Sequence, residues 1–283
     1  MTPPFTHQYP RVLSIAGSDS GGGAGIQADL KTFSALGCFG MTAITALTAQ
    51  NTLGVQTIHG VPAPILSAQI DAVVEDIGVD AVKIGMLHAP DIVQAVTETI
   101  DRHRLTQVVL DPVMIATSGA VLIGEDAVQA LIRQLFTRSQ LITPNLDEAG
   151  FLVNRPLHTE ADMQAAATQL LDMGAQAVLL KGGHLAGEVV SDLFMSRTAP
   201  TFWIRAPRIH SHNTHGTGCT LSSAIAAHLA LGQDLTSAIH SAHGYVRTAL
   251  QAGAHVRTGA GSGPLNHSAA PLAMQLRTLK PVS

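Results

Sequence analysis

Short apolar, β-branched runs alternate with longer amphipathic segments along most of the chain, and this alternation constrains the fold more than any other feature. Runs such as Val108–Leu110 and Val178–Leu180 carry no polar residue, which is typical of parallel strands covered on both faces. Repeated strand–helix–strand units cross over in the right-handed sense and place helices on both sides of one sheet. The sequence therefore predicts an α/β fold with a doubly wound, mainly parallel sheet flanked by helices.

The periodicity assigns the elements in order along the chain. Strands are expected at residues 11–16, 41–48, 55–58, 81–86, 107–111, 140–143 and 177–180. Helices are expected at residues 25–36, 65–77, 90–104, 126–136, 159–173 and 220–231. Between residues 187 and 208 the pattern changes to short strands, which we expect to form a hairpin at the sheet edge. Residues 11–267 are expected to form a single domain, with a flexible tail at 1–10 and a second tail at 268–283.

Charge and cysteine content exclude several classes of partner. The net charge is −4 and only 13% of residues are charged, so neither nucleic acid nor an anionic membrane is an expected partner. The two cysteines, Cys38 and Cys219, are too few for a disulfide framework. No apolar run is long enough to span a bilayer, and residues 1–10 lack the apolar core of a signal peptide. We therefore expect a cytoplasmic globular protein.

Unusual polar and glycine residues follow the predicted strands at the points where the strands end. They are Gly17-Ser18-Asp19, Gln50-Asn51, Met86, Asp111-Pro112, Thr143-Pro144-Asn145 and Lys181-Gly182-Gly183. In open parallel sheets, ligands bind beyond the carboxyl ends of the strands. The sequence therefore predicts one binding site along this edge.

The segment Asn213–Ser222 places two glycines, several hydroxyls and a thiol at the start of an apolar helix. Glycine lets the backbone approach a ligand closely, and the first N–H groups of a helix have no partner within it. Such donors at the positive end of the helix dipole favour an anion, and Cys219 would face it. The alternative is an ordinary glycine turn followed by a small buried cysteine.

The first glycine run, Gly21–Gly25, lies between a predicted strand and a helix and formally matches a dinucleotide-binding loop. That fold requires an acidic residue after the next strand, where residues 49–51 are uncharged, so NAD binding is disfavoured. No Lys-Ser/Thr pair follows the glycines, so the run is not a Walker loop either. Asp19 and Asp29 are the polar candidates near this loop, and Asp19 is equally consistent with a turn or capping residue.

Four further side chains at the strand ends suit phosphate and metal chemistry. Lys181 follows an apolar strand and precedes two glycines, which favours contact with a phosphate. Asp111 is suited to Mg²⁺ or to the triphosphate, although its position before Pro112 also fits a turn. Glu148 is a candidate ligand of hydrated Mg²⁺. Asn145 and Glu148 are three residues apart, so a capping box is the alternative for this pair.

Three histidines, His210, His212 and His215, superficially resemble a metal cluster. No carboxylate or cysteine ligand set accompanies them in the sequence. Structural zinc sites require four such ligands in a closed arrangement, so a zinc site is disfavoured here.

Taken together, these segments resemble the hydroxymethylpyrimidine and hydroxymethylpyrimidine-phosphate kinases of thiamine synthesis, in the pyridoxal-kinase-related branch of the ribokinase-like superfamily. The resemblance runs from about Val12 to His267 and rests on seven segments in order. These are Ala16–Asp29, Thr45–Thr52, Lys83–Leu87, Leu110–Met114, Ile142–Asn145, Lys181–His184 and Thr214–Thr220, with a matching Gly261–His267 ending. His212 stands where some relatives carry lysine.

The resemblance implies a role for individual residues. Gln50 resembles the glutamine that recognises the pyrimidine, and the rest of the substrate pocket would be Gly17, Asp29, Met86 and Val113. Cys219 occupies the position of the base, and the helix N-terminus is expected to lower its thiol pKa toward neutrality. Gly216, Thr217 and Gly218 would form the anion hole beside the catalytic Lys181. The nucleotide-binding residues would be Asp111, Thr143, Asn145, Lys181 and Thr214, and the Mg²⁺ residue would be Glu148.

The implied activity is phosphorylation of hydroxymethylpyrimidine to its monophosphate and then to the diphosphate, with ATP and Mg²⁺ as cofactors, by an enzyme that forms a homodimer. Pyridoxal kinase is the nearest alternative, because relatives take both rings. A ligand-binding protein on a non-catalytic kinase scaffold is a second alternative. It is disfavoured by the presence of the expected catalytic and metal-binding residues Lys181, Glu148 and Cys219. A dinucleotide-dependent oxidoreductase is the third.

Overall fold

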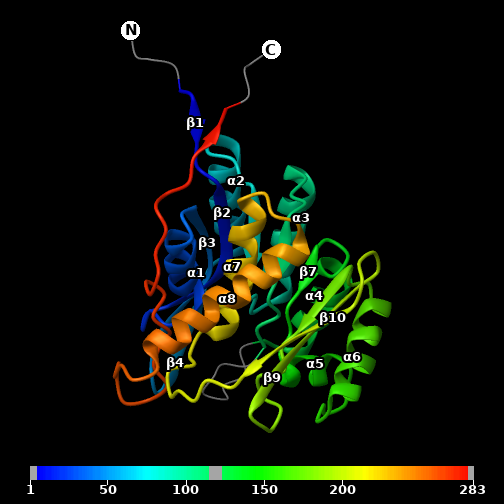
Figure 1. The fold of residues 1–283 in the computed structure, drawn as a ribbon. Helices are drawn as coiled ribbons and strands as arrows, with labels where there is room; N and C mark the ends of the chain where they lie inside the picture. The colour runs from blue at the N-terminus through cyan, green and yellow to red at the C-terminus, as the bar shows by residue number, and fades with distance from the viewer. Residues whose placement is uncertain (1–4, 115–122, 280–283) are drawn as a thin grey trace.

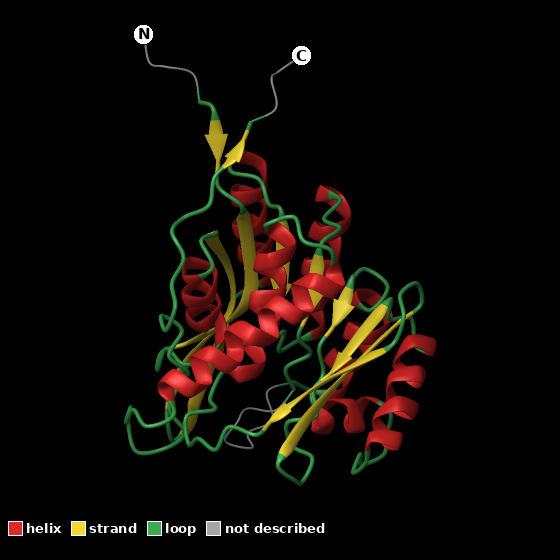
Figure 2. Cartoon of the chain, viewed as in Figure 1, coloured by secondary structure: helices red, strands yellow, loops and turns green. Residues whose placement is uncertain are grey.

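A nine-stranded sheet forms the centre of the molecule, with helices on both faces (Figures 1 and 2). The computed structural model describes residues 5–114 and 123–279. The strands of this sheet are β2 (Arg11–Asp19), β3 (Phe39–Asn51), β4 (Gly54–Gly60), β5 (Ala81–Ile84), β6 (Val108–Leu110), β7 (Leu141–Ile142), β8 (Ala177–Leu180), β9 (Val189–Ser196) and β10 (Phe202–Pro207). The helices are α1 (Gly25–Ala35), α2 (Ala63–Asp76), α3 (Pro90–His103), α4 (Glu125–Leu135), α5 (Leu146–Leu152), α6 (Glu160–Asp172), α7 (Thr217–Ala230) and α8 (Leu235–Gly253).

The strand order is β10-β9-β8-β7-β6-β5-β2-β3-β4. The pairs from β3 to β8 are parallel, whereas β4 and the β9–β10 hairpin are antiparallel at the two edges. The predicted doubly wound, mainly parallel sheet and the predicted hairpin at its edge are therefore confirmed.

Two apolar clusters fill the space between the sheet and its two helix layers. Along β2, Leu13 and Ile15 point into the cluster with α2 to α6, and Val12 points into the cluster with α1, α7 and α8. Successive side chains of a strand alternate between faces, so one apolar strand supplies both clusters. This is why the runs that form β6 and β8 lack polar positions.

Local signals in the sequence set several helix boundaries. α3 starts with Pro90 in its first turn and ends at Arg104, which adopts a left-handed conformation with φ of 53°. α6 has a capping box between Thr159 and Asp162. The described helices are each too short or too polar to cross a lipid bilayer.

The structure differs from the sequence prediction in three places. α8 was not predicted, although its buried Ala238, Ile239, Ala242, Val246 and Ala249 recur at helical spacing. β5 ends at Ile84, so Met86 lies in the following loop. Residues 7–8 (β1) and 277–278 (β11) pair as a small antiparallel sheet, where no strand was predicted (Figure 1).

Candidate active site

The carboxyl ends of the parallel strands open into a cavity of about 620 Å³. Thirteen of the predicted site residues line it, and they come from six strand ends and from the start of α7. They are Gly17, Gln50, Met86, Asp111, Val113, Asn145, Glu148, Lys181, Thr214, Gly216, Thr217, Gly218 and Cys219. Two predicted residues, Asp29 and Thr143, are fully buried outside the lining.

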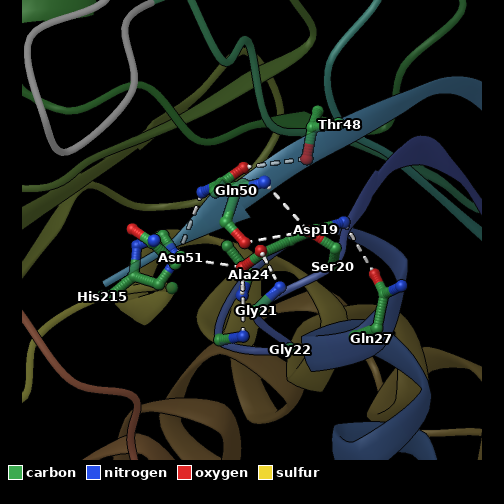
Figure 3. A network of polar contacts seen from close by, with 12 residues as sticks. Asp19, Ser20, Gly21, Gly22, Ala24, Gln27, Thr48, Gln50, Asn51 and His215 are labelled. Atoms are coloured by element: carbon green, nitrogen blue, oxygen red, sulfur yellow. Dashed lines mark hydrogen bonds and ion pairs between the residues drawn. The ribbon is translucent and has the colours of Figure 1, made fainter. Parts of the chain in front are cut away.

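Asp19 organises the first glycine loop (Figure 3). Its carboxylate accepts hydrogen bonds from the backbone N–H groups of Gly21, Gly23 and Ala24, at 2.8 to 3.0 Å. Its Oδ2 also lies 3.0 Å from Nε2 of His215. Burial acts to raise the pKa of Asp19, but these hydrogen bonds outweigh burial and hold the pKa below its ordinary value. The turn interpretation of Asp19 is therefore confirmed, and the same residue lines the cavity.

The loop before α7 packs directly against the first glycine loop. Gly216 has a φ of 82°, and a Cβ on it would lie 1.9 Å from the carbonyl oxygen of Gly23. A Cβ on Gly23 would in turn lie 2.4 Å from Cδ2 of His215. Only glycine fits at these two positions. The glycines of the two motifs therefore allow the two loops to pack directly against each other.

The N-terminus of α7 presents free backbone donors to the cavity. The helix begins at Thr217, and Gly216 is its N-cap. The N–H groups of Gly218 and Cys219 belong to the first turn, where no acceptor within the helix is available. A Cβ on Gly218 would lie 3.0 Å from Nζ of Lys181, so the lysine stands beside these donors. An anion at this point meets both the helix dipole and a cation.

The pKa of the Cys219 thiol differs from the value expected from the sequence. Burial raises its pKa to about 11, and the nearby carboxylates of Asp111 and Asp29 raise it too, whereas Lys83 and the N–H of Gly25 lower it. The expectation of a pKa near neutrality was wrong, because burial outweighs the helix N-terminus. Roughly one thiol in ten thousand is ionised at pH 7. Cys219 therefore meets a ligand as a neutral thiol.

A buried ion pair lies behind Cys219 that the sequence interpretation missed. Nζ of Lys83 lies 2.9 Å from Oδ2 of Asp29, and both side chains are fully buried. Asp29 also accepts hydrogen bonds from the hydroxyls of Ser14, at 2.5 Å, and Ser223, at 2.6 Å. Burial opposes the charge on Lys83, but Asp29, Cys219 and Asp111 together raise its pKa above the ordinary value. A lysine between Val82 and Ile84 in an apolar strand was the available signal.

These contacts separate the roles of the two residues. Lys83 contributes to the cavity lining, whereas Asp29 has no exposed surface, lies outside the lining and is ion-paired with Lys83. The predicted direct contact between Asp29 and a substrate is not available in this arrangement, because the lysine and two serine hydroxyls occupy its carboxylate.

A second group of charges surrounds Lys181. Its Nζ lies 2.8 Å from Oδ1 of Asp111 and 4.0 Å from Oε2 of Glu148. Thr143 donates a hydrogen bond to the same Asp111 oxygen at 3.0 Å, so Thr143 supports the site through Asp111. Burial acts to raise the pKa of Asp111, but Lys181 and Lys83 hold it below the ordinary value.

Glu148 carries two roles at once. Its side chain accepts a hydrogen bond from the N–H of Asn145, and the Asn145 side chain accepts one from the N–H of Glu148, so the capping box is present. Both residues nevertheless line the cavity. Burial raises the pKa of Glu148 to about 7, opposed by Lys181 and supported by Asp111. At neutral pH this carboxyl is close to half protonated.

Gly17, Gln50, Met86 and Val113 line another part of the cavity. A Cβ on Gly17 would lie 2.8 Å from Cε of Met86, so Gly17 leaves room for this methionine. The carbonyl of Met86 accepts a hydrogen bond from the hydroxyl of the buried Thr45 at 2.8 Å. Gln50 and Val113 complete this side. The lining fits a small, flat ring with one polar edge.

The far end of the cavity contains residues that were not predicted. The buried Asp192 of β9 accepts a hydrogen bond from the N–H of Gly182 at 2.8 Å, and burial raises its pKa to about 6. Its other oxygen lies 3.6 Å from Nε2 of His243, which α8 contributes together with Arg247. His243 and Arg247 were missed because α8 itself was not predicted, and Asp192 lies in the edge hairpin, for which no site residue was predicted.

Comparison with known proteins identifies the group to which this architecture belongs. The sequence profile described as phosphomethylpyrimidine kinase matches residues 19–266. The chain belongs to this family. A hydroxymethylpyrimidine/phosphomethylpyrimidine kinase of Rhizobium meliloti is 50% identical over 258 residues, which cover 90% of this chain and 96% of that protein. The protein with the same name in Escherichia coli is 46% identical over 256 residues, covering 90% and 96% of the two chains.

Solved structures of family members and of pyridoxal kinases share the fold. A phosphomethylpyrimidine kinase of Clostridium difficile is 42% identical, with a TM-score of 0.74 over 85% of this chain and 99% of that chain. A pyridoxal kinase of Bacillus subtilis, solved as an ADP complex, is 37% identical, with a TM-score of 0.84 over 93% and 98%. The chain is therefore a kinase with a ribokinase-like fold, and the oxidoreductase alternative is excluded.

Proposed function

We propose that this kinase transfers the γ-phosphoryl group of ATP to hydroxymethylpyrimidine, and then a second phosphoryl group to the resulting monophosphate. One observation carries the proposal: a single cavity joins a small pocket with a polar edge, at Gln50, to the helix N-terminus beside Lys181. The relatives named for both phosphorylations support it. The order of donors and acceptors on the Gln50 amide suits a ring nitrogen next to an amino group.

The chain's own residues supply positioning and charge stabilisation. The hydroxymethyl group would lie at Cys219, with the γ-phosphoryl over the N–H groups of Gly218 and Cys219. Lys181 and these N–H groups would hold the charge on the transferring group. Phosphoryl transfer passes through a loose transition state in which the acceptor oxygen keeps its proton until late. A thiol with a pKa of about 11 already holds its proton, so Cys219 would orient the acceptor hydroxyl, and the hydroxyl proton would pass late to an oxygen of the transferred phosphoryl group.

The carboxylates of Glu148 and Asp111 fit a hydrated Mg²⁺ ion. Both lie beside Lys181 in the cavity, and oxygen ligands with retained water are what Mg²⁺ requires. When bound, the ion would neutralise charge on the nucleotide phosphates. Glu148 would then lose its proton, because its pKa of about 7 reflects burial that Lys181 only partly offsets, and a bound Mg²⁺ ion would favour the charged form further. We therefore propose that Mg²⁺ affinity rises with pH near neutrality through Glu148.

The direct test is ADP release with Mg·ATP and three separate acceptors: hydroxymethylpyrimidine, its monophosphate and pyridoxal. Turnover with both pyrimidines, at least about tenfold faster in kcat/KM than with pyridoxal, is the expected result. A preference for pyridoxal would move the assignment to pyridoxal phosphorylation, which the similarity to the Bacillus subtilis pyridoxal kinase makes the second candidate. Absence of turnover with all three would contradict both.

Three further features of this chain are proposed with the activity. Exposed apolar side chains on the β3–β4 edge, Leu47, Leu53 and Ile58, support a homodimer. Sedimentation of the purified protein at twice the chain mass would test this.

The free thiols of Cys38 and Cys219 support a cytoplasmic location. Residues 11–267 contain the whole cavity lining, which supports a single kinase domain with tails at 1–10 and 268–283.

A further inference from the structure

The amide group of Gln50 lies between a histidine and a threonine at the edge of the cavity (Figure 3). As drawn, the amide nitrogen is 3.3 Å from Nε2 of His215, and the amide oxygen is 3.2 Å from Oγ1 of Thr48. The oxygen and nitrogen of a glutamine amide exchange places by half a turn of the last side-chain bond. The two neighbours therefore decide which atom faces which side.

Nε2 of His215 is a hydrogen-bond donor. It lies 3.0 Å from Oδ2 of Asp19, and an ionised carboxylate oxygen only accepts. Asp19 is ionised, because hydrogen bonds from His215 and from the N–H groups of Ala24 and Gly21 outweigh its burial and lower its pKa. Nε2 therefore carries a hydrogen in both the neutral and the charged imidazole. An amide nitrogen of Gln50 facing it would set two donors against each other, whereas the amide oxygen would share the Nε2 hydrogen with Asp19.

Thr48 selects the same orientation from the other side. Its hydroxyl has one hydrogen, and Oγ1 lies 2.8 Å from the carbonyl oxygen of Ser18, which only accepts. With that hydrogen given to Ser18, Oγ1 presents lone pairs to Gln50 and accepts from an N–H. Both neighbours therefore favour the amide turned by half a turn from the placement in Figure 3, with its oxygen towards His215 and its nitrogen towards Thr48.

We infer that the Asp19–His215 pair and Thr48 lock the Gln50 amide in one orientation and thereby set which substrate ring the pocket accepts. His215 and Asp19 are positioning residues in this inference, which rests on the proposed function. A 4-aminopyrimidine presents an acceptor nitrogen next to an N–H donor, and its 4-oxo counterpart presents the reverse order. The reacting hydroxymethyl group must stay beside Cys219, so the ring cannot turn over to compensate. A locked amide accepts the first ring and rejects the second.

The matched experiment compares kcat/KM for 5-hydroxymethyl-2-methylpyrimidine carrying either a 4-amino or a 4-oxo group. The wild-type enzyme is expected to prefer the amino ring strongly. His215→Phe keeps a ring in the same space but removes the donor, and Thr48→Val removes the acceptor. Each variant is expected to reduce the preference roughly tenfold or more, because the amide can then turn. The ratio of two substrates is insensitive to the fraction of active enzyme, so partial misfolding does not mimic the effect.

Ser20→Ala is the control variant. The Ser20 hydroxyl accepts a hydrogen bond from the backbone N–H of Gln50 at 2.9 Å and donates one to its backbone carbonyl at 2.8 Å. These hydrogen bonds involve the backbone of Gln50 and not its side-chain amide. The preference of this variant for the amino ring should equal that of the wild type. An unchanged preference in both His215→Phe and Thr48→Val would overturn the lock.

A second measurement needs no substrate. In ¹⁵N-histidine-labelled protein, His215 is expected to carry a hydrogen on Nε2, read from its ring-nitrogen shifts and assigned by their loss in His215→Phe. An unprotonated Nε2 would overturn the inference, even where His215→Phe abolishes turnover. Failure of the proposed function would look different: the wild type would phosphorylate neither pyrimidine, while Nε2 of His215 would still be protonated.

Discussion

The buried Lys83–Asp29 pair offers the sharpest test of how the site is held. Both side chains have no exposed surface, and the lysine nitrogen lies within 2.9 to 3.0 Å of both carboxylate oxygens. Lys83→Met keeps the apolar stem and removes the charge. The Asp29 carboxylate would then keep only the hydroxyls of Ser14 and Ser223 as donors. Removing one partner of a buried pair costs about 3–5 kcal/mol of unfolding free energy, because the other charge stays buried without compensation.

The double variant Lys83→Met/Asp29→Asn is the matched control. The introduced amide would be neutral and would still bond to both serine hydroxyls, so the double variant keeps no buried charge at this pair. We expect this variant to lose only about 1–2 kcal/mol relative to the wild type, less than Lys83→Met alone. The assay is urea unfolding at pH 7, with unchanged m-values as evidence that the folded states are comparable. A loss below about 1 kcal/mol in Lys83→Met, or additive losses in the two single variants, would refute the reasoning.

The same variants report on the Cys219 thiol. Lys83 is the charge that lowers its pKa most, and Asp29 raises the pKa by less. The thiol pKa should therefore rise in the order wild type, double variant, Lys83→Met. The rate of iodoacetamide alkylation between pH 8 and 10 should fall in the same order, with the modified peptide identified by mass spectrometry. Cys38 is buried, and its thiol pKa of about 12 keeps it slow in all three proteins.

The remaining predictions concern the loops and the acid–base groups. Gly216→Ala should lower kcat by two orders of magnitude or more, because its Cβ would collide with the Gly23 carbonyl and displace the donors of α7; activity within about tenfold of wild type would contradict this. Cys219→Ala should lower kcat for hydroxymethylpyrimidine by roughly 10²-fold and for the monophosphate by much less, since the second acceptor is already an anion; equal losses in ADP release would refute this division. Glu148, with a pKa raised to about 7, contributes stability that is complete below its unfolded pKa, near 4.5, and is lost as pH rises through 7. Glu148→Gln should therefore remove a decline of roughly 1–3 kcal/mol in unfolding free energy between pH 5 and 7.5, measured in urea; the same decline in both proteins would contradict the assignment.

Local patterns were sufficient for most of the fold. The apolar runs that became β6 and β8 are signals only a few residues long, and their lack of polar positions follows from being covered on both faces. The two glycine loops were also predicted from the sequence, because segments whose backbones pack closely against each other require glycine. α8 was missed, although its buried residues, which include Ile239 and Val246, recur at helical spacing.

The state of the site groups depended on contacts between distant parts of the chain. Asp19 and His215 are 196 residues apart, and Lys83 and Asp29 are 54 apart, so no sequence window contains either pair. The Cys219 pKa was mispredicted for the same reason, since its helix position is local but its burial is not. The sequence by itself determined which chemical groups gather at the strand ends. Only the tertiary structure decided which of them face the cavity, which are neutralised by a partner and which proton each one holds, because burial and pairing are properties of the packed chain.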